Sequence, residues 1–237
     1  SLEKDPLLLI NPVQSLKNAY ITTNTALMVT DIHYMTSGCT CVTVYLKENT
    51  LHVANAGDSR AVMAREDEAG NFVACNLSRD HKPDDPDEQS RIEASGGYVC
   101  PPYEEGLSAR VYLDPHFTMI GLAMSRSIGD HAVKNVGVTA EPEVKIFEVD
   151  QHDKFMIMGS DGVWEFISSQ EAVDIVKSCL DEGYGVPEAC QELIETAAAR
   201  WQEEEGDYRD DITAIVVRFP LPNFAESTVT TETNEAT

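Results

Sequence analysis

Short segments in which side chains alternate in character limit this chain to a fold built on antiparallel strands. Val42, Val44 and Leu46 alternate with Thr43 and Tyr45, as expected for a strand that turns one face toward a core. Short turns separate the first four such segments, so each can pair with the next as in a meander. The strand-like segments are residues 42–46, 51–55, 60–64, 72–77, 144–147, 155–158 and 212–219.

The longer helical patterns lie at the two ends of this series. An Asn-Pro pair predicts the start of a helix over residues 12–29, because Asn caps well and Pro suits the first helical position. Ser168 and Glu171 have the spacing of a capping box, and another amphipathic helix begins near Pro187. Strands and helices do not alternate one by one, which favours an α+β fold, an antiparallel sheet packed by helices.

The middle of the chain is expected to differ from this pattern. Residues 84–94 predict a short acidic helix that ends at the Gly96-Gly97 pair. Residues 98–120 contain Pro101-Pro102 and Asp114-Pro115, and we interpret them as an irregular excursion away from the core.

Composition bounds the class of protein and its partners. The 237 residues suffice for one large domain or two small ones, and there is no apolar run of about 18 residues that would predict a membrane span. The net charge is −24, from 41 acidic and 17 basic residues. Such a surface repels phosphate-rich partners, so we expect no nucleic acid and no membrane among them. For most of the acidic residues, solubility is a sufficient explanation.

The cysteines indicate the compartment. The six cysteines show neither a Cys-x-x-Cys motif nor a zinc-ligand spacing. Reduced, buried thiols are therefore expected, in a cytoplasmic or nuclear protein. The sequence begins at Ser1 without a signal-peptide pattern, and we interpret this start as a cut end of a longer chain.

Three short acidic segments carry the candidate chemistry. Asp58, Asp161 and Asp210 each lie next to a strand-like run, and Glu165 follows Asp161 by four residues. Carboxylates held at the ends of strands suit Mg²⁺ or Mn²⁺, which prefer oxygen ligands. Taken singly, each has an ordinary alternative: a hairpin residue, a carboxylate that satisfies turn amides, or a strand-start turn in which Arg209 forms a salt bridge.

In order and wording, these segments resemble the metal-dependent protein Ser/Thr phosphatases of the PP2C (PPM) family. The resemblance covers about residues 10–219. Its motifs include Asn-Ala-Gly-Asp-Ser-Arg-Ala-Val, Arg-Asp-His-Lys-Pro, Ser-Asp-Gly-Val-Trp and Asp-Asp-Ile-Thr. The matching segments are residues 37–40, 55–62, 78–83, 88–97, 122–130, 141–144, 159–164 and 210–213.

The resemblance implies an antiparallel β-sandwich flanked by helices, with a flap insertion at about residues 79–116. It also implies two core Mn²⁺ or Mg²⁺ ions, with a third in some members, and a metal-activated water that attacks phosphoserine or phosphothreonine directly. By position, Asp161 and Asp210 match ligands of the first core metal. Asp58 and Glu165 match the outer third site, with Thr40 nearby; Glu165 stands where relatives often have Asp.

Other residues in these motifs receive structural interpretations. We expect Arg60, Arg126 and Asp130 to brace strands and turns, and His81 to be a packing or turn residue. No catalytic or substrate-binding side chain is assigned. The domain prediction is a phosphatase domain over residues 1–219, followed by a disordered acidic tail over residues 220–237.

One family motif is missing. The resemblance implies an Asp-Gly-His-Gly-Gly segment before the first helix and an Arg further upstream, and no Asp-Gly-His occurs in this sequence. The chain alone is therefore expected to have little or no activity, and we interpret it as an N-terminally incomplete part of an active, monomeric phosphatase that acts on phosphoproteins. The alternative is a natural pseudophosphatase, a non-catalytic binding module for signalling partners.

Overall fold

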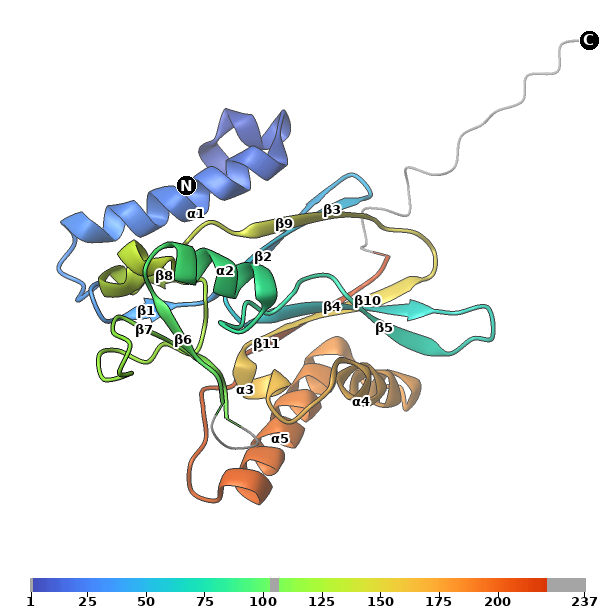
Figure 1. The fold of residues 1–237 in the computed structure, drawn as a ribbon. Helices are drawn as coiled ribbons and strands as arrows, with labels where there is room; N and C mark the ends of the chain where they lie inside the picture. Colours follow the sequence, from blue (N-terminus) through green and yellow to red (C-terminus); the bar gives the residue numbers. More distant parts are fainter. Residues whose placement is uncertain (1, 103–106, 221–237) are drawn as a thin grey trace, which may run out of the picture.

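The computed structural model describes residues 2–102 and 107–220 and shows two antiparallel sheets between layers of helices (Figure 1). One sheet has the strand order β11-β10-β4-β5 and the other the order β2-β3-β9. The strands are β2 (Cys41–Lys47), β3 (Thr50–Ala56), β4 (Arg60–Glu66), β5 (Phe72–Asn76), β9 (Glu143–Glu148), β10 (Asp153–Gly159) and β11 (Ala214–Arg218). This is the predicted mixed α+β fold, with helices on antiparallel sheets.

Alternation along the central strands explains the layers. In β10, Phe155 and Ile157 face a core shared with the C-terminal helices, whereas Met156 faces the core between the two sheets. In β4, Val62 and Met63 divide in the same way. Because successive side chains of a strand point to opposite faces, both faces of the four-stranded sheet are buried.

Helix α1 (Pro12–Ala26) covers the outer face of the three-stranded sheet. Asn11 caps it by accepting a hydrogen bond from the N–H of Gln14 at 3.1 Å. The buried Tyr20 donates its hydroxyl hydrogen to the carbonyl of Ala54 in β3 at 3.0 Å. A 3₁₀ turn, Leu27–Val29, continues the helix, so the predicted span of residues 12–29 is confirmed.

Helices α4 (Ser169–Asp181) and α5 (Val186–Glu205) cover the four-stranded sheet on its other side (Figure 1). Ser168 accepts from the N–H of Glu171 at 3.2 Å, as the capping box predicts. The Glu171 carboxylate does not complete the box, because it binds Arg200 of α5 at 2.6 Å. Ser168 thus caps α4, whereas Glu171 links α4 to α5.

The prediction of an irregular segment over residues 98–120 is wrong in part. β6 (Tyr98–Cys100) and β7 (Arg110–Tyr112) form a two-stranded sheet beside α2 (Pro86–Ala94). Val111 is fully buried and packs with Ile92 of α2. Three-residue strands next to prolines are too short to show a clear period in sequence, whereas their burial against a helix stabilises them.

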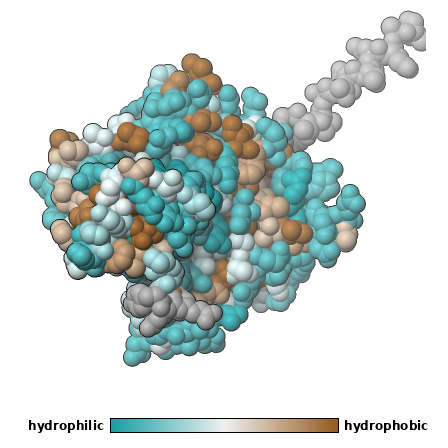
Figure 2. Space-filling model, viewed as in Figure 1, coloured by the Kyte–Doolittle hydropathy of each residue, from teal (hydrophilic) through white to brown (hydrophobic). Residues whose placement is uncertain are grey.

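The remaining elements are short. They are the 3₁₀ turns Leu2–Lys4, Pro6–Leu9 and η4 (His131–Val136), the helix α3 (Asp161–Trp164), and the paired strands β1 (Gly38–Cys39) and β8 (Ile128–Gly129). None of the described helices is both long and apolar enough to cross a bilayer. The face in Figure 2 is largely hydrophilic, with apolar residues in small groups.

All six cysteines are free thiols, as predicted, but the prediction that they are buried is wrong. Cys39 is exposed and the other five are partly exposed. The strand breaks at Thr40, between β1 and β2, so Cys39 does not continue the pattern that begins at Cys41. Of the predicted tail, residues 221–237 lie outside the described part of the chain.

Candidate metal and phosphate site at one edge of the sheet

Three of the predicted carboxylates come to one edge of the four-stranded sheet. Gly159, the last residue of β10, pairs with Arg60 at the start of β4 and with Ala214 at the start of β11. Asp161 follows this point, and Asp58 and Asp210 precede the two partner strands. Antiparallel pairing therefore gathers residues that are far apart in sequence.

Backbone hydrogen bonds hold the segments of Asp161 and Asp210 together. The N–H of Ser160 donates to the carbonyl of Thr213 at 3.0 Å, and the N–H of Thr213 donates to the Ser160 hydroxyl at 3.1 Å. These contacts also explain why β11 begins at Ala214 and not at Ile212, where the sequence predicted it. A Cβ on Gly162 would lie 2.4 Å from the carbonyl oxygen of Asp211, so only glycine fits between the two segments.

The turn after Asp161 is anchored in the core. Trp164 is buried, and its indole N–H donates to the carbonyl of Gly159 at 2.8 Å. Trp201 of α5 donates in the same way to the carbonyl of Gly162 at 2.8 Å. One helical turn beyond Asp161, the exposed Glu165 donates its N–H to the Asp161 carbonyl at 2.9 Å. Glu165 thus lies beside the edge with its side chain toward solvent.

Asp58 is nearly inaccessible and carries an ion pair. Its Oδ2 atom lies 2.8 Å from the ammonium nitrogen of Lys82, a residue that the sequence analysis did not single out. The turn before it is tight, since Gly57 has a φ of +116° and a Cβ there would lie 2.3 Å from Cγ2 of Thr40. The Thr40 hydroxyl in turn lies 2.8 Å from that of Ser59, so Thr40 supports the turn, near Asp58 as expected.

The charges of these groups act on one another. The pKa of Asp161 is raised from its ordinary 3.8 to about 6, first by burial and then by the negative charges of Asp58 and Asp210. Lys82 and the N–H of Gly162, which donates to Asp161 at 3.0 Å, oppose this rise. Burial works to lower the pKa of Lys82, yet the net direction is upward because of nearby carboxylates. Mutually repelling, partly desolvated carboxylates of this kind are typical of a cation site.

The oxygen donors therefore fit a divalent cation, but the distances between the carboxylates do not form a complete coordination site. Within residues 2–102 and 107–220, no three His, Cys, Asp or Glu side chains lie close enough together to hold a metal ion. Asp58, Asp161 and Asp210 can each offer carboxylate oxygens to this edge, and Lys82 supplies a positive charge to Asp58 there. Arg209, the predicted salt-bridge partner, forms no ion pair within these ranges.

The motif residues interpreted as structural have extensive contacts. Arg60 forms two hydrogen bonds to Asp80, at 2.9 and 2.7 Å, and its guanidinium lies 5.2 Å from the Trp164 ring centre. Arg126 binds the fully buried Glu88 of α2. Asp130 has a left-handed conformation with a φ of +47°, and its N–H donates to the carbonyl of Ser37 at 2.9 Å. These contacts are consistent with bracing roles.

His81 is fully buried, and burial lowers its pKa to about 4. Its Nδ1 atom lies 3.2 Å from the backbone nitrogen of Gly57, next to Asp58. A neutral, packed imidazole at this point agrees with the packing role predicted for it.

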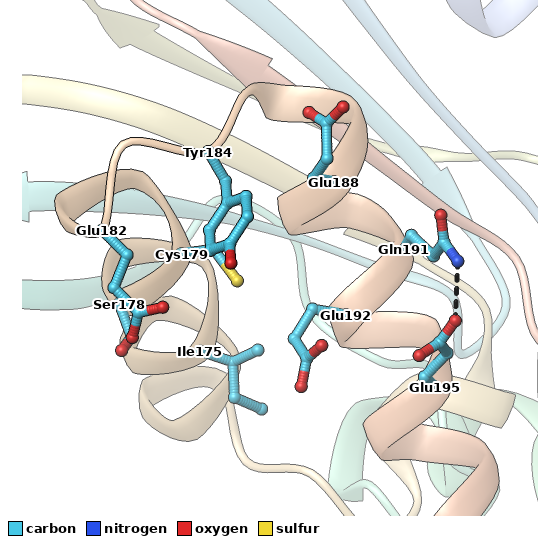
Figure 3. A pocket seen from close by; sticks show the side chains of 9 residues that line it. All are labelled: Ile175, Ser178, Cys179, Glu182, Tyr184, Glu188, Gln191, Glu192 and Glu195. Atoms are coloured by element: carbon cyan, nitrogen blue, oxygen red, sulfur yellow. Dashed lines mark hydrogen bonds between the residues drawn. The ribbon is translucent and has the colours of Figure 1, made fainter.

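A well-defined pocket lies elsewhere. It has a volume of about 570 Å³ and lies between the end of α4 and the first half of α5, where it is lined by Tyr184, Cys179 and several glutamates (Figure 3). None of the four predicted metal ligands lines it. A second hollow of about 470 Å³ does adjoin the site, since Arg60 and Lys82 contribute to its wall.

Comparison with known proteins identifies the family of this chain. A family model described as "Protein phosphatase 2C" matches residues 2–206. The chain belongs to the PP2C family. This family is typically dependent on manganese or magnesium.

Among curated PP2C relatives, "Probable protein phosphatase 2C 73" of Arabidopsis thaliana is 39% identical over 184 residues, which are 77% of this chain and 48% of that protein. "Probable protein phosphatase 2C 64" of Oryza sativa is 40% identical over 181 residues, 76% of this chain and 41% of the relative. The chain thus spans about half the length, or less, of the curated relatives it matches.

The solved structures show the same PP2C fold. The serine-threonine phosphatase 2C of Toxoplasma gondii superposes with a TM-score of 0.77 at 29% identity, over 91% of this chain and 69% of that one. A sex-determining protein of C. elegans, at 19% identity and a TM-score of 0.68, shares the fold. The superposition covers 90% of this chain and 48% of the C. elegans protein.

Proposed function

We propose that this chain is part of a metal-dependent protein phosphatase that hydrolyses phosphoserine and phosphothreonine in protein substrates. The pairing of β10 with β4 and β11, which brings the segments of Asp58, Asp161 and Asp210 to one edge of the sheet, is the observation that supports this most directly. The raised pKa of Asp161 agrees with it. A fold with no use for cations would gain nothing from charges that repel one another in a partly buried position.

In this proposal Asp161 and Asp210 hold the first of two core Mn²⁺ or Mg²⁺ ions, and Asp58 and Glu165 contribute to an outer third site. Bound divalent ions would neutralise the phosphate, orient it and make a water acidic enough to act as the nucleophile. The chain's own part is to aim the carboxylates. The close contact of Gly162 with Asp211 fixes the distance between the segments of Asp161 and Asp210. The indole N–H groups of Trp164 and Trp201 bind the backbone of the turn that follows β10.

The position of the site also suggests how a substrate approaches. The net charge of −24 repels a phosphorylated peptide, so local cations are needed. Arg60, Arg79, Lys82 and Lys145 line the hollow of about 470 Å³ next to Asp58. The region of residues 79–116, which contains α2, β6 and β7, begins at this hollow, and we propose it as the flap. The monomeric state stays a prediction.

The alternative is a non-catalytic PP2C-like binding module. It is favoured by the absence of Asp-Gly-His from the sequence and by the lack of a three-ligand cluster within the described residues. Whether the missing motif precedes Ser1 in a longer chain stays a prediction.

Phosphate release separates the two. A phosphothreonine peptide should lose phosphate in a manganese-dependent reaction with the longest natural form of the protein, and Asp161→Asn or Asp210→Asn should reduce the rate by at least about 100-fold, as expected for a lost core ligand. Asp207→Asn is the matched control, because Asp207 is exposed in the same loop. No release by a folded, manganese-loaded protein would reject the enzymatic proposal and leave the binding module.

A further inference from the structure

Hydrogen bonds to the backbone join the segment that contains Asp58 to the segment that contains Lys82. The N–H of His81 donates to the carbonyl of Gly57 at 3.0 Å. The side-chain amide of the buried Asn55 donates both to the carbonyl of Gly57, at 3.1 Å, and to that of Arg79, at 2.9 Å. With His81 also buried against Gly57, the backbone of Lys82 has a fixed position relative to Asp58.

From this position the Lys82 side chain extends toward the acidic residues of the candidate site. Its ammonium nitrogen lies 2.8 Å from Oδ2 of Asp58, whose side chain is only 4% exposed. The Lys82 charge acts on Asp161 as well, and it is itself influenced by Glu165. Of the four residues to which the proposed function gives metal ions, the ammonium thus binds Asp58 directly and interacts electrostatically with Asp161 and Glu165.

We propose that Lys82 is a tethered cation that neutralises Asp58 and competes with a divalent metal ion for this carboxylate. The inference rests on the proposed function, because it uses the assignment of Asp58 to the outer metal site. In one state the ammonium binds Asp58; in the other the metal ion binds Asp58 and Lys82 turns away. The pairing lets the outer site exist without a metal, since a nearly inaccessible carboxylate without a partner would be costly.

The surroundings provide a place for the displaced side chain. The Lys82 side chain is 30% exposed, and it lines the hollow of about 470 Å³ together with Asp80 and Asp85. Asp80 is held by Arg60 at 2.7 and 2.9 Å, whereas Asp85 lies 4.0 Å from Arg79 and can receive the ammonium there. A lysine chain has several rotatable bonds, so it can move between the two positions without movement of the backbone.

Charge removal tests this competition. Lys82→Met keeps most of the aliphatic chain and removes the ammonium, so Asp58 becomes available and the repulsion between two cations disappears. We expect Mn²⁺ affinity to rise on the order of 10–100-fold, given that unit charges a few ångströms apart interact strongly at partly buried sites. Free Mn²⁺ measured by electron paramagnetic resonance during titration of the 237-residue chain reports this directly.

Three further variants identify the source of the effect. Lys82→Arg keeps the charge and should retain the affinity of the wild type. Lys145→Met is the matched control, because Lys145 lines the same hollow but pairs with Glu143 at 3.2 Å instead of Asp58. Asp58→Asn combined with Lys82→Met should cancel the gain. Unchanged or weaker binding by folded Lys82→Met protein, or an equal gain for Lys145→Met, would overturn the proposal.

A measurement on the wild-type chain does not depend on how the variants fold. Acylation of lysines, quantified by mass spectrometry, should be faster at Lys82 when Mn²⁺ is added, because the ammonium leaves Asp58, and unchanged at Lys145. An identical rate at Lys82 up to saturating Mn²⁺ would also overturn the proposal. Neither readout requires phosphatase activity, so the competition and the proposed reaction can fail separately.

Discussion

Replacing Asp161 by asparagine should stabilise the protein while removing its proposed metal ligand. The folded structure raises the pKa of this carboxyl from 3.8 to about 6, through burial and the charges of Asp58 and Asp210. Folding therefore favours the protonated form, and at neutral pH the ionised carboxylate reduces the free energy of unfolding. Asparagine keeps the oxygen that accepts from the N–H of Gly162 and removes the charge.

The size of the effect follows from the pKa change. A rise from 3.8 to about 6 corresponds to about 3 kcal/mol if all of it acts on folding. Asp161 is half-buried, and solvent screens part of the interaction, so about 1–2 kcal/mol is a better expectation. For a domain of this size, Asp161→Asn should then raise Tm by about 2–8 °C at neutral pH.

Thermal unfolding followed by circular dichroism, with EDTA present, measures this gain. The sign can be checked with pH. Because the folded pKa is the higher one, the penalty grows as pH rises from about 4 to about 7, so the difference between wild type and variant should shrink toward pH 4. Asp207→Asn, at an exposed position in the neighbouring loop, is the control and should leave Tm at pH 7.5 unchanged. A lower Tm for Asp161→Asn at pH 7.5, or a difference that does not depend on pH, would refute the electrostatic account of this site.

Two further predictions concern packing and charge near the site. Gly162→Ala places a Cβ 2.4 Å from the Asp211 carbonyl oxygen, so chemical denaturation should show that the free energy of unfolding falls by about 1–3 kcal/mol. Gly185→Ala is the control and should cost less, because its Cβ meets the movable end of the Glu188 side chain. Equal losses for the two variants would contradict the close-approach argument. Glu88→Gln removes a fully buried carboxylate whose pKa is held low, against burial, by Arg91, Arg126 and Ser125, and a loss of about 3–5 kcal/mol at neutral pH is expected. Since that pKa is depressed, the wild-type advantage should decrease progressively as the solution is acidified below about pH 4, and an advantage that stays undiminished on acidification would speak against this account.

The strands and the helix ends were predictable because their signals are local. Alternation located β2 to β5, and Asn11 and Ser168 located two helix starts. The pairing of β10 with both β4 and β11 was not local. The sequence analysis did not predict it; the family resemblance implied only that Asp161 and Asp210 share a metal ion, and this pairing is what brings them to one edge.

The errors have a common physical cause. β6 and β7 are short and are stabilised by burial of Val111 against α2, which no window of sequence contains. Glu171 was expected to complete a cap, but Arg200, far along the chain, offers a stronger, charged partner. Lys82 was quoted within a motif without a role, because its partner Asp58 is identified only by the fold.

β11 is an edge strand of the four-stranded sheet and comes after β4 and β10 in the sequence, so the site is assembled in steps. Asp58 and Asp161 flank interior strands, whereas Asp210 arrives with a strand that pairs only with β10. A growing polypeptide on the ribosome must therefore expose two of these acids before the third has been synthesised. Fraying of that single border strand would likewise separate Asp210 from the others and leave both layers of the sandwich in place.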